Sequence, residues 1–334
     1  MRRPILGKRS LLLVGAAIAF VAPACSTATS NSTRPSGTST LKVAVIVPSA
    51  SNDLAFSQSM VDAVNSLKTR DDLQIAVSDN QFAESDAANV IRRYASQGYS
   101  LIIAHGSQYG AIVQRMAPQF PKVSFAWGTA SSTFNLPNVF AYQANSNEGG
   151  YVQGYMGAML SKSHVVGAIG PLPVGDAKRY IDGFKAGAKA ADKAIDVHVA
   201  YTGSFSDVSL MTKEARGFLA DHADVLTGSS QAVVGAVRVA KSHHTAWFGT
   251  QSNQASLAPG AVVSSQVYDW TKVLQQIITA IRGGTLGGAM YTITLANGGE
   301  KIVFNPMFRL PADVKSAGEK QISRVEDGSI TVPR

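Results

Sequence analysis

The chain has 334 residues, more than one compact core usually occupies, which predicts two domains of roughly 100–200 residues each. Apolar residues make up 45% and charged residues 16%, which excludes an intrinsically disordered chain. A single cysteine excludes a disulfide scaffold and a cysteine-rich zinc site. The formal net charge is +8, and removal of the first 24 residues would leave +4, too little to indicate nucleic-acid binding.

The first 24 residues have the layout of a secretory signal peptide. A basic segment precedes an apolar run at 11–22, and Ala22-Pro23-Ala24 has the small residues of a cleavage site. Cys25 then resembles the lipid-acceptor cysteine of bacterial lipoproteins, although ordinary cleavage beside a chance cysteine stays open. Residues 25–40 are rich in Ser and Thr, which predicts a flexible, lipid-anchored tether. We therefore expect an exported protein held at the membrane.

Short apolar runs alternate with amphipathic stretches from residue 41 onward. The runs predict strands at 41–49, 73–78, 100–105 and 123–127. The stretches between them space apolar residues at three and four, which predicts helices at 53–67, 84–97 and 109–119. This alternation is typical of a parallel sheet with helices on both faces.

The second half of the chain repeats the first. Three pairs of identical residues stand 123 positions apart: Pro48 and Pro171, Phe82 and Phe205, Gln108 and Gln231. Gly128 and Gly249, in similar local sequences, stand 121 apart. The repeat predicts an α/β fold with two similar doubly wound parallel-sheet lobes.

The chain is expected to cross between these lobes more than once. Residues 41–144 plus about 266–288 are assigned to the N-lobe, and 145–265 plus about 289–334 to the C-lobe. Strand-like segments on either side of Asn297-Gly298-Gly299 predict a two-strand hairpin, followed by a last helix. Such crossings predict a multi-strand hinge that lets the lobes close around a ligand.

Ligands of open parallel sheets bind beyond the carboxyl ends of the strands. Applied to both lobes, this rule nominates a set that is mostly amides, hydroxyls and aromatics, which favours a neutral, planar or ring-bearing small molecule. The candidates are Ser51, Asn52, Asp53, Phe56, His105, Ser107, Gln108, Trp127, Tyr142, Asn145, Phe205, Asp207, Ser229, Ser230, Gln231, Gln251, Asn253, Gln266, Tyr268 and Asp269.

Several candidates also have a purely structural interpretation. Asn52 and Asp53 are at positions that cap a helix, and Phe56 lies one turn into that helix, where burial against the sheet is usual. Trp127 fits packing at the edge of a lobe. Phe205 follows a Gly-Ser turn, a poor place for a core residue, which favours stacking on a ligand.

Enzyme signatures are missing from the sequence. Ser107 and Ser230 lack the G-x-S-x-G pattern of a hydrolase, and no phosphate-binding P-loop occurs. His243 and His244 are adjacent, so on a strand they cannot both face one metal ion. We expect a protein without catalytic activity, cofactor or metal.

From about Leu41 to its end, the chain resembles the basic membrane lipoprotein family, the purine nucleoside receptor group of type I periplasmic binding proteins. The motifs that carry the resemblance are SNDLAFSQS, FPKVSFAWGT, YQANSNEGGYVQGYMGAML, DGFKAGA and TGSFSD. The resemblance implies a lipid-anchored receptor that delivers a nucleoside to an ABC permease. It also implies that the base lies between two aromatic rings, one from each lobe.

Carried over by position, Phe56 matches the ring of the N-lobe and Phe205 the ring of the C-lobe. Asn52 or Asp53 matches the family's polar residue in the first loop.

The ribose-binding acid and lysine of the family have no evident match in this sequence. Gln251 and Tyr268 stand in their places, or, after a slip of one residue, Asn253 and Asp269 come into question. The expected ligand is a purine nucleoside or a nucleobase-like solute. The receptor is expected to be a monomer. A sugar receptor of the same fold, or a ligand sensor for a membrane receptor, remain alternatives.

Overall fold

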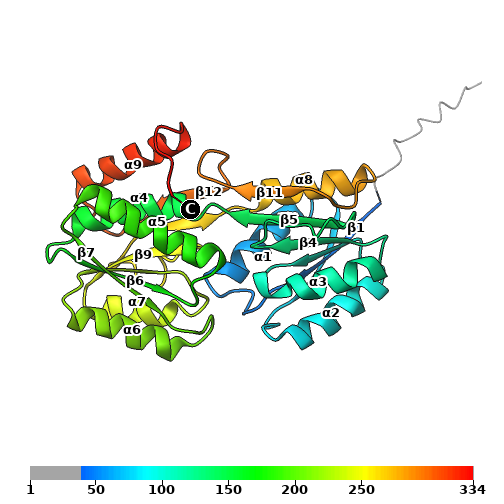
Figure 1. Ribbon diagram of the computed structural model, residues 1–334, viewed down its shortest axis with the longest axis horizontal. Coiled ribbons are helices and arrows are strands. Elements are labelled where there is room, and N and C mark those ends of the chain that lie inside the picture. The colour runs from blue at the N-terminus through cyan, green and yellow to red at the C-terminus, as the bar shows by residue number, and fades with distance from the viewer. Residues whose placement is uncertain (1–38, 334) are drawn as a thin grey trace, which may run out of the picture. The chain divides into compact units, whose positions relative to one another are not determined.

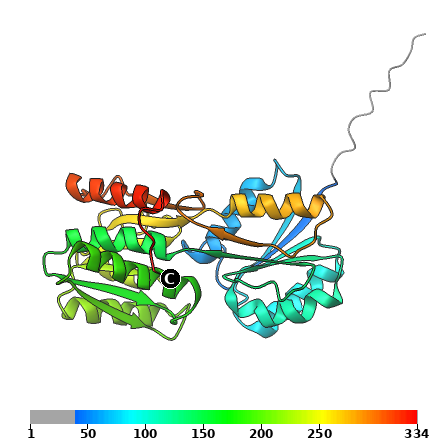
Figure 2. The same ribbon diagram turned by 45° about the horizontal axis from the view of Figure 1, so that its top comes forward.

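The computed structural model describes residues 39–333 (Figures 1 and 2). The predicted signal peptide, most of the predicted tether and Cys25 lie outside the described residues. Within residues 39–333, no helix has both the length and the apolar character to cross a bilayer.

The inner strands of the first sheet are apolar runs that are buried on both faces, as is usual in parallel sheets. Its strand order is β11-β5-β4-β3-β1-β2, and every neighbouring pair is parallel. The strands are β1 (Leu41–Ile46), β2 (Leu73–Ser78), β3 (Leu101–Ala104), β4 (Ser124–Gly128), β5 (Val139–Ala144) and β11 (Met290–Ile293).

Helices cover both faces of this sheet (Figure 1). On one face, α1 (Phe56–Leu67) and α8 (Thr271–Arg282) share an apolar core with the strands. On the other face, α2 (Glu84–Ser96) and α3 (Gly110–Met116) build a second core. Short 3-10 turns, Ser107–Tyr109 and Ala117–Gln119, flank α3. The predicted strands and helices of this half are thus confirmed, with ends that differ by a few residues.

The second sheet repeats this plan in the order β12-β10-β9-β8-β6-β7. Its strands are parallel apart from β12, which pairs antiparallel with β10. They are β6 (Val165–Gly170), β7 (Asp196–Tyr201), β8 (Val225–Gly228), β9 (Ala246–Gln251), β10 (Val262–Tyr268) and β12 (Glu300–Phe304). The covering helices are α4 (Asn147–Leu160), α5 (Gly175–Ala191) and α9 (Ala312–Glu326) on one face, and α6 (Val208–Ala220) and α7 (Val234–Ser242) on the other.

The glycines of α4 and α5 let these two helices touch backbone to backbone. A Cβ at Gly154 would overlap the Phe184 carbonyl oxygen, and a Cβ at Gly187 would overlap the Tyr151 carbonyl oxygen. Gly150 and Gly183 make the same kind of approach. The glycine-rich motifs that carried the family resemblance therefore encode this helix contact.

The last two strands correct the sequence-based prediction. The predicted hairpin is wrong, because β11 pairs with β5 in the first sheet whereas β12 pairs with β10 in the second. The Asn297 carboxamide oxygen accepts hydrogen bonds from the Thr294 and Gly299 amides and so shapes a link between the two sheets. The expected lobe boundaries shift accordingly: residues 290–293 join the N-lobe sheet, and β10 keeps residues 266–268 in the C-lobe sheet.

Candidate functional site

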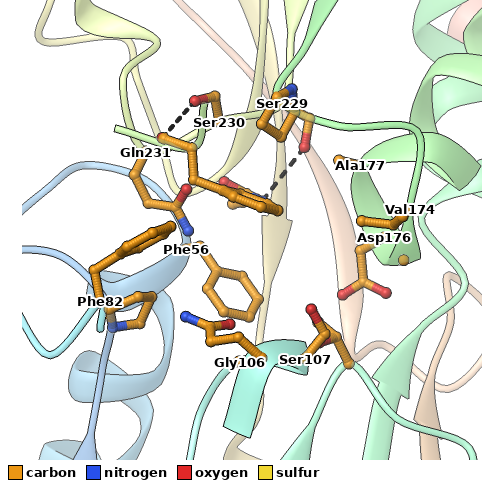
Figure 3. A pocket seen from close by; sticks show the side chains of 17 residues that line it. Phe56, Phe82, Gly106, Ser107, Val174, Asp176, Ala177, Ser229, Ser230 and Gln231 are labelled. Carbon is orange, nitrogen blue, oxygen red and sulfur yellow. Dashed lines mark hydrogen bonds between the residues drawn. The ribbon is translucent and has the colours of Figure 1, made fainter. Parts of the chain in front are cut away.

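A cavity lies where the loops after strands of both sheets face each other, and it holds about 480 Å³ including the space at its open mouth. Eight of the nominated residues line it: Phe56, Ser107, Gln108, Phe205, Ser229, Ser230, Gln231 and Gln251. Figure 3 shows Phe56, Phe82 and Gln231 on one side of the space and Asp176 on the other.

His105 lies behind the N-lobe ring rather than in the cavity. Its imidazole stacks on Phe56 with ring centroids 3.8 Å apart and planes 9° apart. Nε2 lies 3.1 Å from the Phe56 carbonyl, which can only accept, so Nε2 carries the proton and Nδ1 accepts from the Tyr142 hydroxyl at 2.8 Å. Burial lowers the pKa of His105 to about 3, so the ring is neutral at physiological pH. His105 is a positioning residue for Phe56.

The cavity has a third aromatic ring that was not nominated from the sequence. Phe82, in the loop after β2, is 47% exposed and lines the cavity together with Phe205, in the loop after β7. The Phe82 loop is fixed because the Tyr109 hydroxyl donates to the Gln81 carbonyl at 2.7 Å. The Ser230 hydroxyl likewise donates to the Phe205 carbonyl at 2.7 Å. Polar neighbours therefore hold both loops while the rings face the cavity.

Gln251 ends strand β9 in a strained conformation. Its φ is 69°, a left-handed value that costs a side-chain-bearing residue about 1–3 kcal/mol. The carboxamide is 5% exposed, and its nitrogen donates to the Ser229 hydroxyl at 3.4 Å. Its oxygen has no hydrogen-bond partner among the described residues. Strain and an unpaired buried acceptor together are typical of a binding position.

Asp176, in the first turn of α5, is a further residue that sequence reasoning missed. Among the described residues that line the cavity, Asp176 is the one with a charged side chain. One carboxylate oxygen accepts from the Arg179 guanidinium, and the other has no partner within the described chain. Burial raises the pKa of Asp176 to about 6, against the opposing effect of the Arg179 guanidinium.

The internal repeat contains a signal that points to both missed residues. The spacing of 123 positions that relates Pro48 to Pro171 also relates Phe82 to Phe205, and Asp53 to Asp176. Once one member of a pair is nominated, the repeat nominates the other.

Two nominated carboxylates cap helices and do not line the cavity. Asp53 accepts from the backbone amides of Ala55, Ser57 and Gln58 at 2.8–3.2 Å. Asp207 caps α6 by accepting from two amides in its first turn. Asn52 is exposed and also lies outside the cavity lining.

Three nominated residues line a separate hollow. Asn253, Tyr268 and Asp269 surround it with residues of α1, and Asp269 forms an ion pair with Lys301 at 2.8 Å. The structure therefore does not bring these three together with the aromatic rings.

The remaining candidates serve packing or local hydrogen bonding. Trp127 stacks on Phe134 at 4.8 Å, in agreement with packing at a lobe edge. The other candidates outside the cavity lining are Ser51, Tyr142, Asn145 and Gln266. Among residues 39–333, no group of three or more His, Cys, Asp or Glu side chains is placed to hold a metal ion.

Comparison with known proteins gives a consistent result. Residues 40–331 match the model of the Bmp family, described as ABC transporter substrate-binding protein PnrA-like. The chain is 27% identical over 260 residues to a purine-binding protein of Brucella abortus, covering 78% of this chain and 73% of that protein. It is 26% identical over 316 residues to the ABC transporter nucleoside-binding protein BmpA of Lactococcus lactis, covering 88% and 89%.

A solved structure has the same fold. The ABC transporter solute-binding protein of Conexibacter woesei matches with a TM-score of 0.71 and 25% identity, covering 88% of this chain and 98% of that one.

Proposed function

Because this chain belongs to the Bmp family of PnrA-like ABC transporter substrate-binding proteins, we propose that it captures a ring-bearing solute, a purine nucleoside or a nucleobase-like compound, between its two lobes. The two-lobed α/β fold, the family and the role as an ABC transporter substrate-binding protein agree with the predictions made from the sequence. Members of the family bind solutes and are not enzymes.

The observation that carries the proposal is the set of three phenylalanine rings around one cavity. Phe56 comes from the first helix, Phe82 from the loop after β2, and Phe205 from the loop after β7. Rings contributed by both lobes can contact both faces of a planar ligand. The ligand then favours the closed form by the contacts that it makes to both lobes at once.

The strength of such a site is adequate for a transport receptor. Stacking on an aromatic side chain contributes about 1–3 kcal/mol per base in nucleic-acid-binding proteins. Two faces together with a few buried hydrogen bonds reach micromolar affinity, which corresponds to about −8 kcal/mol.

The location of the receptor is part of the same proposal. The signal-peptide layout and the position of Cys25 support export followed by lipid anchoring, with the tether of residues 25–40 linking the anchor to the lobes. The relatives named for purine and nucleoside binding support the choice of ligand.

A thermal-shift screen of the protein against nucleosides, nucleobases, sugars and amino acids tests the proposal. A ligand at a hundredfold excess over its Kd stabilises the fold by about 2.7 kcal/mol, which shifts the melting temperature measurably. We expect nucleosides or nucleobases to give this shift. Stabilisation by sugars or amino acids alone would contradict the proposed ligand class.

A second measurement tests the rings. Phe205→Ala should weaken the binding of the purine identified in the screen at least tenfold by calorimetry, with the melting temperature of the free protein unchanged. An unaltered Kd would reject Phe205 as a stacking residue.

A further inference from the structure

We infer that Asp176 selects among ring-bearing solutes by accepting a hydrogen bond from an exocyclic amino group on the edge of the ring. The inference rests on the proposed function, because it narrows the ligand class of the same cavity.

One carboxylate oxygen of Asp176 is unpaired within the described residues. The side chain is 4% exposed, and its second carboxylate oxygen accepts no hydrogen bond within residues 39–333. Figure 3 shows the carboxylate pointing into the cavity, on the side of Ser107. A buried acceptor atom that is left without a hydrogen bond costs about 1–3 kcal/mol. A donor on the ligand removes this cost, so the cavity is matched to a donor-bearing ligand.

The charges around the cavity favour a neutral ligand. The Arg179 guanidinium already pairs with the other oxygen of Asp176, so the pair is neutral overall. No further charged side chain of the described chain lines the cavity. The site therefore favours a neutral N–H donor over an ammonium group, which would need a second negative charge to offset its desolvation.

Asp176 differs from the carboxamides around the cavity in the hydrogen bonds that it can make. The carboxamide oxygens of Gln231 and Gln251 also lack partners among the described residues. A carboxamide offers both a donor and an acceptor and can turn to suit either kind of ligand atom. A carboxylate offers acceptors alone. Asp176 thus fixes which hydrogen-bonding pattern the ligand must present.

Matched pairs of probes test this role in the wild-type protein. Adenosine and 6-chloropurine riboside differ by an amino group that a chlorine of similar size replaces. Guanosine and inosine differ by the amino group at the opposite end of the ring. We expect at least one pair to show a tenfold or greater preference for the member with the amino group, measured by calorimetry.

Variants then locate the preference. Asp176→Ala should reduce the ratio of the two Kd values in that pair to less than threefold. Asp176→Asn keeps an acceptor oxygen and should retain a larger share of the preference. Asp182→Asn is the matched control, because this carboxylate lies on the same helix and pairs with Lys178 but does not line the cavity. It should leave the ratio unchanged.

The outcomes are distinguishable. If the probes bind the wild-type protein but both ratios lie within twofold, the assignment of Asp176 is overturned and the proposed function stands. The same holds if Asp176→Ala binds with the wild-type ratio. If Asp176→Ala does not fold, the wild-type ratios together with Asp176→Asn decide. If no nucleoside or nucleobase binds the wild-type protein, the proposed function fails and this inference falls with it.

Discussion

The rings of Phe82 and Phe205 lie 6.1 Å apart, centroid to centroid, with their planes tilted by 48°. Each residue follows the second strand of its own sheet, so the repeat in the chain places equivalent side chains against each other in the lining of the cavity. The cavity has a pseudo-symmetric aromatic rim, and a ligand that separates the two rings would contact both.

Phe82→Ala should weaken ligand binding three- to tenfold with little change in stability. The ring is 47% exposed and belongs to none of the apolar cores, so its loss should alter the free energy of unfolding by less than about 0.5 kcal/mol. Calorimetry and denaturant unfolding measure the two quantities. Met307→Ala is the control, because Met307 is 70% exposed and does not line the cavity. Equal affinities of wild type and Phe82→Ala would remove Phe82 from the site.

Gly154→Ala should lower the free energy of unfolding by about 1–3 kcal/mol or more. The added methyl group would overlap the Phe184 backbone, which cannot move without separating α4 from α5. Gly217→Ala is the matched control in the helical part of α6, where the new Cβ meets open space. It should stabilise the protein by about 0.5–1 kcal/mol through helix propensity. Urea unfolding compares the two, and equal effects would disprove the close helix contact.

His105 should make the protein less stable as the pH falls. Its pKa is lowered to about 3 in the folded state, against about 6.5 in the unfolded chain, so the unfolded state binds the extra proton between these values. Between pH 7 and pH 5 the contribution of His105 to the unfolding free energy should fall by about 2 kcal/mol.

Unfolding of wild type and His105→Gln at both pH values isolates this effect, since the other histidines are common to both proteins. The wild type should lose about 2 kcal/mol more than the variant. Parallel losses would show that His105 is protonated in the folded state.

Glu300 should lower the free energy of unfolding as the pH rises. Burial raises the pKa of this carboxyl well above its ordinary value, and the neighbouring Glu148 and Asp176 carboxylates add to the shift. Because the folded state keeps the proton after the unfolded chain has released it, stability falls as the pH rises above about 4.5. Glu300→Gln removes this loss while its amide oxygen can still accept from Gln266.

The stability of Glu300→Gln relative to wild type should therefore increase from pH 5 to pH 8. Denaturant unfolding at several pH values measures it, with Glu326→Gln, exposed at the end of α9, as the control. If the free energy of unfolding of Glu300→Gln fell relative to that of wild type as the pH rises, Glu300 would be ionised when buried.

The repeat and the apolar runs were sufficient to predict two parallel sheets with helices on both faces. The sheet to which the last strands belong was not predictable in the same way. β11 and β12 are both short apolar-rich segments near an Asn-Gly turn, a pattern typical of a hairpin. β11 lies at the edge of the first sheet beside β5, and β12 lies at the edge of the second sheet beside β10; this pairing depends on tertiary structure.

The roles of two aspartates in the site were likewise not predictable from the sequence. Asp53 and Asp176 occupy equivalent positions of the repeat, after the first strand of each sheet. The carboxylate of Asp53 accepts hydrogen bonds from Ser49, Ala55 and Ser57. One carboxylate oxygen of Asp176, in contrast, has no partner among the described residues. Sequence alone gives the positions, but the hydrogen bonds that occupy each carboxylate appear only in the folded chain.

Both sheets receive an edge strand from the last part of the chain, so both are completed late in synthesis. The sheet that begins at residue 41 gains its last strand at 290–293, and the other sheet gains its last strand at 300–304. Neither half can complete its hydrogen bonding until the ribosome has released almost the entire polypeptide. Both sheets therefore acquire their full set of strands only near the end of synthesis.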